Sequence, residues 1–116
     1  MKRDMDLIRE MLLWMESHDE RLILLNQFEV FRDDRELTLG HIALLKSAGF
    51  VDEPQKAVLR ITWEGHEFLD KVRDPEIWSK TKEGASKLNS WGVKLIGEMA
   101  TGFIRAKAAE LGIPLA

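Results

Sequence analysis

The chain has 116 residues, with 17 basic against 20 acidic side chains, no cysteine, 45% hydrophobic residues and 32% charged residues. This length suits one globular domain with a real core. The lack of cysteine excludes disulfides, thiolate metal sites and a cysteine nucleophile. The slight acidity removes the general attraction that drives non-specific nucleic-acid binding, so any DNA contact must come from a local patch.

The start of the chain, Met-Lys-Arg-Asp-Met-Asp, carries charges where a signal peptide needs an apolar stretch. No later run approaches the ~18 apolar residues that a membrane span requires. We therefore expect a soluble, cytoplasmic protein with no membrane contact.

A first helix is predicted over 4–18, with Asp4 or Asp6 as its N-cap. Its apolar residues recur three and four apart, at Met5, Ile8, Leu12 and Met15. Residues 21–31 are ambiguous, because a continuous apolar run at 22–25 precedes an alternating pattern at 28–30. We expect a strand near Gln27–Arg32.

A second helix is predicted from Arg35 to Ala48, with Asp33 or Asp34 as N-cap and Gly49 as a left-handed C-cap. Its apolar spacing is carried by Leu37, Leu44, Leu45 and Ala48. His41 continues this face, which favours a partly buried histidine bonded to a neighbour. The three histidines, His18, His41 and His66, are not paired at helical spacing, so no metal site is expected.

Two strands, at 50–52 and 57–63, flank a polar break at 53–56 and predict a hairpin. Thr62 is placed to cap a helix that ends before Pro75. We expect Trp63, His66 and the pair Phe68-Leu69 to lock the base of the hairpin onto the second helix.

The sequence Asp74-Pro75 predicts the start of a short helix that Gly84 closes. The last helix is expected from Ser86 to Leu111, stopped by Gly112 and Pro114. Its apolar face consists of Leu88, Leu95, Ile96, Met99 and Phe103. Packing of this face within the chain and packing across a homodimer are equally compatible with the pattern.

The order of elements predicts an α+β, mostly helical domain that is winged-helix-like, with a small β-hairpin wing and a C-terminal helical extension. We expect residues 1–83 to form the core and residues 84–116 to form the extension of the same single domain.

Three motifs in the first two thirds of the chain have a more specific pattern. They are MKRDMDLIR at 1–9, HIALL at 41–45 leading into AGFV at 48–51, and ITWEGHEFLD at 61–70 followed by Arg73-Asp74 and Trp78. In this order they closely resemble the domain of unknown function 2513 family. The resemblance implies a winged-helix-like core and a phage or prophage setting, and it supplies no catalytic residues.

The leading hypothesis is a non-enzymatic DNA-binding regulator that presents its second helix to double-stranded DNA. The expected contacts are Arg35, Thr38 and Lys46 on that helix, with Lys56 and Arg60 on the wing. The opposing acidic residues are Asp33, Asp34, Glu36, Asp52 and Glu53.

The alternative is a module that binds a host or phage protein without binding DNA. A continuous basic strip from Lys46 to Lys56 and Arg60 would favour DNA, and its interruption by Asp52 and Glu53 would favour a protein partner. His66 with Glu67 and Asp70 could form a general-base arrangement, but the sequence offers no nucleophile motif or phosphate loop beside it. We therefore expect neither an enzyme nor a bound cofactor.

Overall fold

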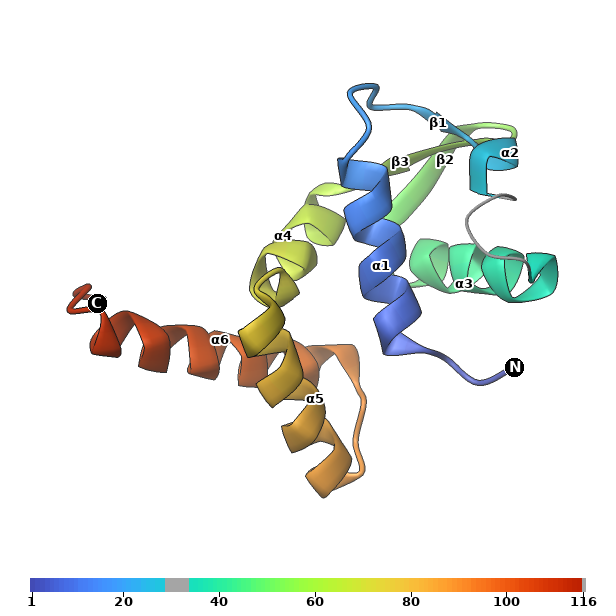
Figure 1. Cartoon of the computed structure of the whole chain (residues 1–116). Helices are drawn as coiled ribbons and strands as arrows, with labels where there is room; N and C mark the ends of the chain where they lie inside the picture. Colours follow the sequence, from blue (N-terminus) through green and yellow to red (C-terminus); the bar gives the residue numbers. More distant parts are fainter. Residues whose placement is uncertain (29–33, 116) are drawn as a thin grey trace. The chain divides into compact units, whose positions relative to one another are not determined.

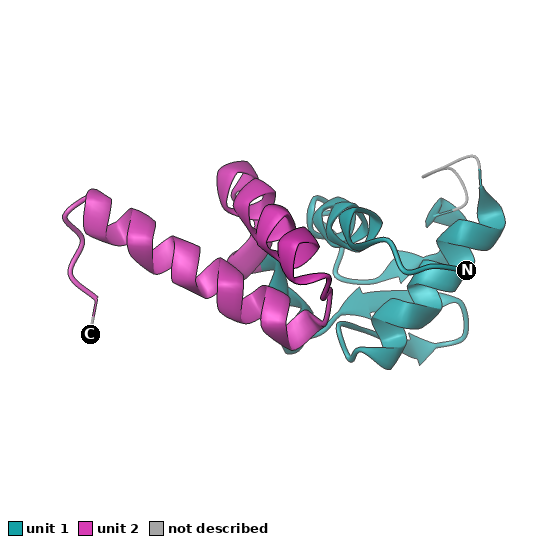
Figure 2. Cartoon of the chain, turned by 90° about the horizontal axis from the view of Figure 1, so that it is seen from below, with its two compact units in different colours: residues 1–69 teal, residues 70–116 magenta. Residues whose placement is uncertain are grey.

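A computed structural model describes residues 1–28 and 34–115. The chain forms two compact units, Met1–Leu69 and Asp70–Ala116, which are coloured separately in Figure 2. The architecture is mostly helical, with one small antiparallel sheet that belongs to the first unit (Figure 1). No helix in the described parts of the chain combines the length and apolar character needed to cross a bilayer.

The first helix, α1 (Met5–Glu16), confirms the prediction from the apolar spacing. It begins after Asp4, whose carboxylate accepts a hydrogen bond from the backbone N–H of Leu7 at 3.2 Å. This side chain satisfies one of the N–H groups that lack a partner at a helix start. The buried face consists of Met5, Leu7, Ile8, Met11, Leu12 and Met15.

The prediction of a strand near Gln27–Arg32 is wrong for residues 27 and 28, which are the part of this range that the structure describes. The strand is β1 (Ile23–Leu24), and it is followed at once by the short helix α2 (Leu25–Phe28), which contains Gln27. Residues 29–33 lie outside the described residues. The apolar run forms the strand because Ile23 and Leu24 pair with Leu59 and Val58, which are distant in the sequence. Phe28 is instead buried against the ring of Trp14.

The second predicted helix is confirmed as α3 (Arg35–Ser47). Asp34 caps its start by accepting from the N–H of Leu37 at 3.0 Å, and Gly49 follows its end at a φ of +80°. Its buried residues are Thr38, His41, Ile42 and Leu45. The inward face is therefore rotated from the expected one, since Ala48 is exposed and Leu37 and Leu44 are only half-buried.

The predicted hairpin is confirmed as β2 (Val51–Gln55) and β3 (Val58–Ile61). Strand β2 extends through most of the expected polar break, and the turn is made at Lys56 and Ala57, with Ala57 at a φ of 62°. The strand order is β1-β3-β2, and both pairings are antiparallel. Leu59, in the central strand, is buried beneath α1, which contacts this strand.

Thr62 joins the sheet to α4 (Trp63–Val72) and caps it as predicted. Its hydroxyl accepts from the N–H of Gly65 at 3.1 Å and donates to the carbonyl of Gly49 at 2.5 Å. The same residue thus starts α4 and ties it to the end of α3.

In the second unit, Asp74 and Pro75 start α5 (Pro75–Leu88) as predicted, and the Asp74 carboxylate accepts from the N–H of Glu76 at 2.8 Å. Two expected boundaries are wrong. Gly84 does not close this helix, which continues to Leu88. Its lack of a side chain leaves room for the Met99 sulfur, which would lie 3.0 Å from an added Cβ. The helix ends at Asn89, which takes the left-handed conformation, and the last helix, α6 (Val93–Glu110), starts later than the expected Ser86.

Helix α6 packs on α5 within the chain. Ile96 is fully buried, Leu95, Met99 and Phe103 are half-buried, and Gly97 and Ala100 join the same buried face. Leu88 was expected on this face, but it is 61% exposed because it lies at the end of α5.

Candidate functional site

The expected DNA-binding residues lie on α3 and on the hairpin, where Arg60 is engaged by a carboxylate. Its guanidinium donates from Nε and Nη2 to the two oxygens of Asp52, at 2.7 and 2.9 Å. These residues face each other across the β2–β3 ladder. The hydrogen-bonded pair lowers the pKa of the Asp52 carboxyl and raises that of Arg60.

Lys46 is engaged in a similar way by Glu53. Its ammonium donates to Oε1 of Glu53 at 2.5 Å, which links α3 to the hairpin, and Oε2 of Glu53 accepts from the N–H of Ala57 at 2.8 Å. The hydrogen bond from Lys46, followed by that from Ala57, lowers the pKa of Glu53. The structure therefore interrupts the basic strip at the two acidic residues, Asp52 and Glu53, that the sequence placed beside it.

Thr38 cannot take the outward position expected of it. It is 1% exposed, and its hydroxyl donates to the carbonyl of Asp34 at 2.9 Å. Its place is set by the rotated face of α3, which directs Thr38 inward with His41 and Ile42. Arg35 and Lys56 are exposed, at the start of α3 and at the hairpin turn.

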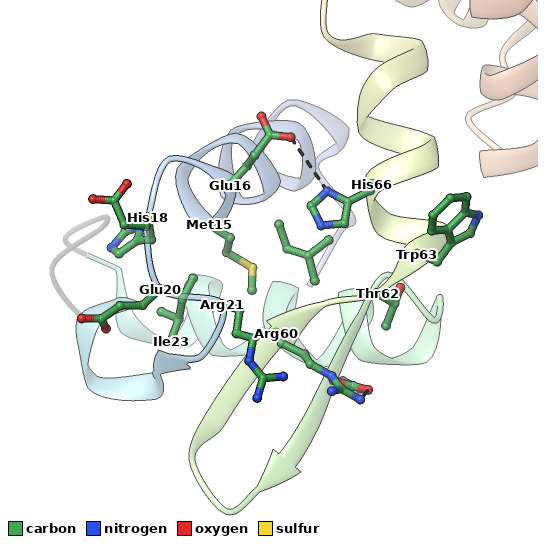
Figure 3. A pocket seen from close by; sticks show the side chains of 13 residues that line it. Met15, Glu16, His18, Glu20, Arg21, Ile23, Arg60, Thr62, Trp63 and His66 are labelled. Carbon is green, nitrogen blue, oxygen red and sulfur yellow. Dashed lines mark hydrogen bonds and ion pairs between the residues drawn. The ribbon is translucent and has the colours of Figure 1, made fainter.

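A separate pocket of about 540 Å³ opens in the first unit between the end of α1, the loop that follows it, β3 and the start of α4 (Figure 3). Its charged lining includes Glu16, Asp19, Glu20, Arg21, Asp52 and Arg60. Trp63 and His66 line it from α4. The segment 18–21 after α1 thus contributes much of a surface that none of the sequence motifs marks, and its run of three charged residues is the signal in the sequence that points to it.

His66 points across this pocket toward Glu16, and its Nδ1 lies 3.9 Å from Oε2 of that carboxylate (Figure 3). The carboxylate beside His66 is therefore that of Glu16 in α1, and not that of Glu67 or Asp70, which the sequence offered as partners for a general base. The side chain of His66 is about half exposed. Among residues 1–28 and 34–115, no three histidine, aspartate or glutamate side chains gather closely enough to hold a metal ion. The pocket brings carboxylate, guanidinium and imidazole groups together, and these groups can form ion pairs and hydrogen bonds with a bound molecule.

Trp63 stands at the edge of the pocket and is 75% exposed. The expectation that it locks the hairpin onto the second helix is therefore wrong. For Phe68, five residues further along α4, the same expectation is confirmed: it is buried, and its ring stacks on that of Phe50, with centroids 4.8 Å apart. Because Thr62 caps α4 immediately before it, Trp63 is the first residue of this helix, and its indole is exposed to solvent.

Residues 2–92 match the family described as "Hypothetical protein (DUF2513)". An uncharacterized protein of Haemophilus influenzae is 38% identical over 92 residues, which cover 71% of this chain and 76% of that protein. No solved structure matches the chain. The family match covers all the residues of the pocket, the hairpin and α3.

Proposed function

The chain belongs to the DUF2513 family, and from the geometry of its first unit we propose that it is a non-enzymatic binding module that recognises a basic surface of another protein. The contact region is the pocket face, which we define as Glu16, Asp19, Glu20, Arg21, Trp63 and His66. The observation that carries the proposal is the exposed indole of Trp63 beside this charged pocket.

Tryptophan and arginine are the residues that most often dominate the binding energy of protein interfaces. A tryptophan has only two side-chain torsion angles, so a partner can bury its large ring at a low cost in side-chain entropy. The polar rim around Trp63 also has the composition of an interface, in which charged groups surround an apolar anchor.

The charge of the first unit points to the chemistry of the partner. Residues 1–69 contain nine basic and fourteen acidic side chains. The pocket face carries three carboxylates, Glu16, Asp19 and Glu20, against the single guanidinium of Arg21. Such a surface attracts lysine and arginine side chains and repels nucleic-acid phosphates. A basic protein segment that covers Trp63 is therefore the partner that fits.

The second candidate is the small DNA-binding regulator of phage or prophage type. The order α1-β1-α2-α3-β2-β3 with the sheet order β1-β3-β2 supports a winged-helix arrangement, in which α3 would enter the major groove. The exposed Arg35 and Lys56 favour this candidate. The pairing of Lys46 with Glu53 and of Arg60 with Asp52 weakens it, because a carboxylate lies beside each of these cations.

The test compares the full chain with Trp63→Ala and with Leu88→Ala, which removes another large exposed side chain from the second unit. Tagged proteins are used to capture partners from an extract of the organism that encodes the chain, and each captured protein is purified and titrated. We expect a partner with a basic contact surface that binds the wild type and Leu88→Ala equally and binds Trp63→Ala at least tenfold more weakly, about 1.4 kcal/mol. Equal binding by all three chains would show that the pocket face is not the surface that contacts the partner.

The DNA candidate is tested by fluorescence anisotropy of a mixed-sequence duplex at about 50 mM and about 200 mM salt. We expect no salt-sensitive binding. Binding that weakens steeply between the two salts and is lost in Lys56→Glu, but not in Lys94→Glu of the second unit, would replace the protein-binding proposal with the DNA-binding one.

A further inference from the structure

The second unit contains a groove that the proposed function does not use. It is lined by the end of α4, the start of α5 and the C-terminal half of α6, and it has a volume of about 480 Å³. Its apolar walls are formed by Pro75, Ile77, Ile104, Ala108, Leu111 and Ile113. Figure 1 shows α6 continuing past α5, so its last turns are uncovered by that helix.

Large apolar side chains gather on this uncovered end. Ile104, Leu111, Ile113 and Leu115 are between 36% and 67% exposed, and all lie in residues 104–115. Ile104, Ala108 and Leu111 follow one another at spacings of four and three, so they share one face of α6. Exposed apolar residues that are contiguous, and not scattered singly, mark an interaction surface.

The tail after α6 is held in place by hydrogen bonds. The N–H of Gly112 donates to the carbonyl of Ala109 at 3.1 Å, and the N–H of Ile113 donates to the carbonyl of Ala108 at 2.9 Å. Gly112 has a φ of +73°, which is typical of the left-handed residue that ends a helix. Ile113 is thereby folded back toward the groove and forms a fixed part of its wall.

The rim of the groove carries both signs of charge in close pairs. Arg73 donates to Asp70 at 2.8 Å, and Lys107 lies 2.8 Å from Asp74 and 3.6 Å from Glu76. A strongly basic or strongly acidic partner would meet like charges on this rim. A second copy related by a twofold axis presents the same mixed rim in the opposite direction. Carboxylates of one copy can then lie near cationic side chains of the other, around an apolar centre that both copies form.

We propose that two copies of the chain associate through this groove, with their α6 helices antiparallel. A crossing centred between Lys107 and Ala108 places Ile104 of one copy opposite Leu111 of the other. The contact is isologous and uses residues of the second unit only. It includes no residue of the pocket face, so the experiment below tests it separately from the proposed partner binding.

The test is the mass of the full chain in solution, measured by sedimentation equilibrium from about 5 to 200 μM, a range that reveals micromolar self-association. We expect a concentration-dependent rise toward twice the 13.4 kDa of one chain. Leu111→Glu should weaken the association at least tenfold, because two carboxylates would enter the apolar centre. Leu88→Glu is the matched control at another exposed leucine of the same unit and should leave the association unchanged.

Circular dichroism of both variants confirms that each retains its helices, which is expected because both leucines are largely exposed. A monomeric wild type at all concentrations would overturn the proposal. Association that persists in Leu111→Glu, or that Leu88→Glu weakens equally, would overturn it as well.

Discussion

The backbone N–H of Asp4 donates a hydrogen bond to Nε2 of His41 at 2.9 Å, across 37 residues of sequence. The other ring nitrogen, Nδ1, lies 2.9 Å from the carbonyl oxygen of Leu37. Because a carbonyl can only accept, this pattern assigns the proton to Nδ1 and leaves Nε2 as the acceptor. His41 confirms the histidine predicted to bond to a neighbour, and it is more completely buried than expected, with 0% exposure.

We expect His41→Ala to lower the free energy of unfolding by about 2–4 kcal/mol, because it leaves a cavity and removes the acceptor of the Asp4 N–H. His66→Ala is the matched control, since its half-exposed ring should contribute less than about 0.5 kcal/mol. Urea denaturation gives both values, and hydrogen exchange of the α1 amides reports the local effect. Equal losses in the two variants would show that the Asp4–His41 link is not important for stability.

The boundaries that the sequence predicted best are those with a local chemical cause. Asp4, Asp34 and the Asp74-Pro75 pair each cap a helix where expected, and Gly49 follows the end of α3. These residues act on backbone groups within three positions of themselves, so their effect does not depend on the rest of the chain.

The predictions that failed depend on contacts between distant segments. Ile23 and Leu24 form a strand because β3 lies beside them, and a two-residue strand has no periodicity to detect. Gly84 matched a helix stop in sequence, but it serves the close approach of Met99 from α6. The exposure of Trp63 likewise follows from the orientation of α4. The pairing of Asp52 with Arg60, which the sequence left open as one of two alternatives, is decided by the register of the hairpin.

Gly65 provides a second prediction, because it lies where α4 passes close to the end of α3. A Cβ added there would lie 2.2 Å from the carbonyl oxygen of Phe50 and 2.8 Å from a methyl group of Ile61. Alanine usually stabilises the interior of a helix relative to glycine. We expect Gly65→Ala to do the opposite and to lower the free energy of unfolding by roughly 1–3 kcal/mol, because a backbone oxygen must move.

Gly102 is the matched control, since no neighbouring atom of the described residues lies within 4 Å of the place that an added Cβ would take on this part of α6. We expect Gly102→Ala to raise the stability by about 0.5–1 kcal/mol. Thermal and urea unfolding of the two variants give the comparison. A stabilising effect of both substitutions would mean that α4 and Phe50 are further apart than the structure places them.

The ion pair of the hairpin gives a prediction for acid. Hydrogen bonding from Arg60 holds the pKa of Asp52 below its ordinary value of 3.8. A carboxyl whose pKa is lower in the folded state contributes stability above its unfolded pKa, and that contribution is lost as the pH falls through the folded value. The coupling between Asp52 and Arg60 should therefore be present at neutral pH and should disappear below the lowered pKa.

The measurement is a double-mutant cycle of the wild type, Asp52→Asn, Arg60→Met and the double variant, each unfolded in urea across the acid range. We expect a stabilising coupling at neutral pH that falls only in acid, and that is smaller in high salt because both side chains are partly exposed. Coupling that persisted in strong acid would mean that packing of the Arg60 side chain, and not its pairing with the Asp52 carboxylate, holds the two strands in register. The same variants, titrated with duplex DNA, show whether removing the Asp52 charge frees Arg60 to bind phosphate.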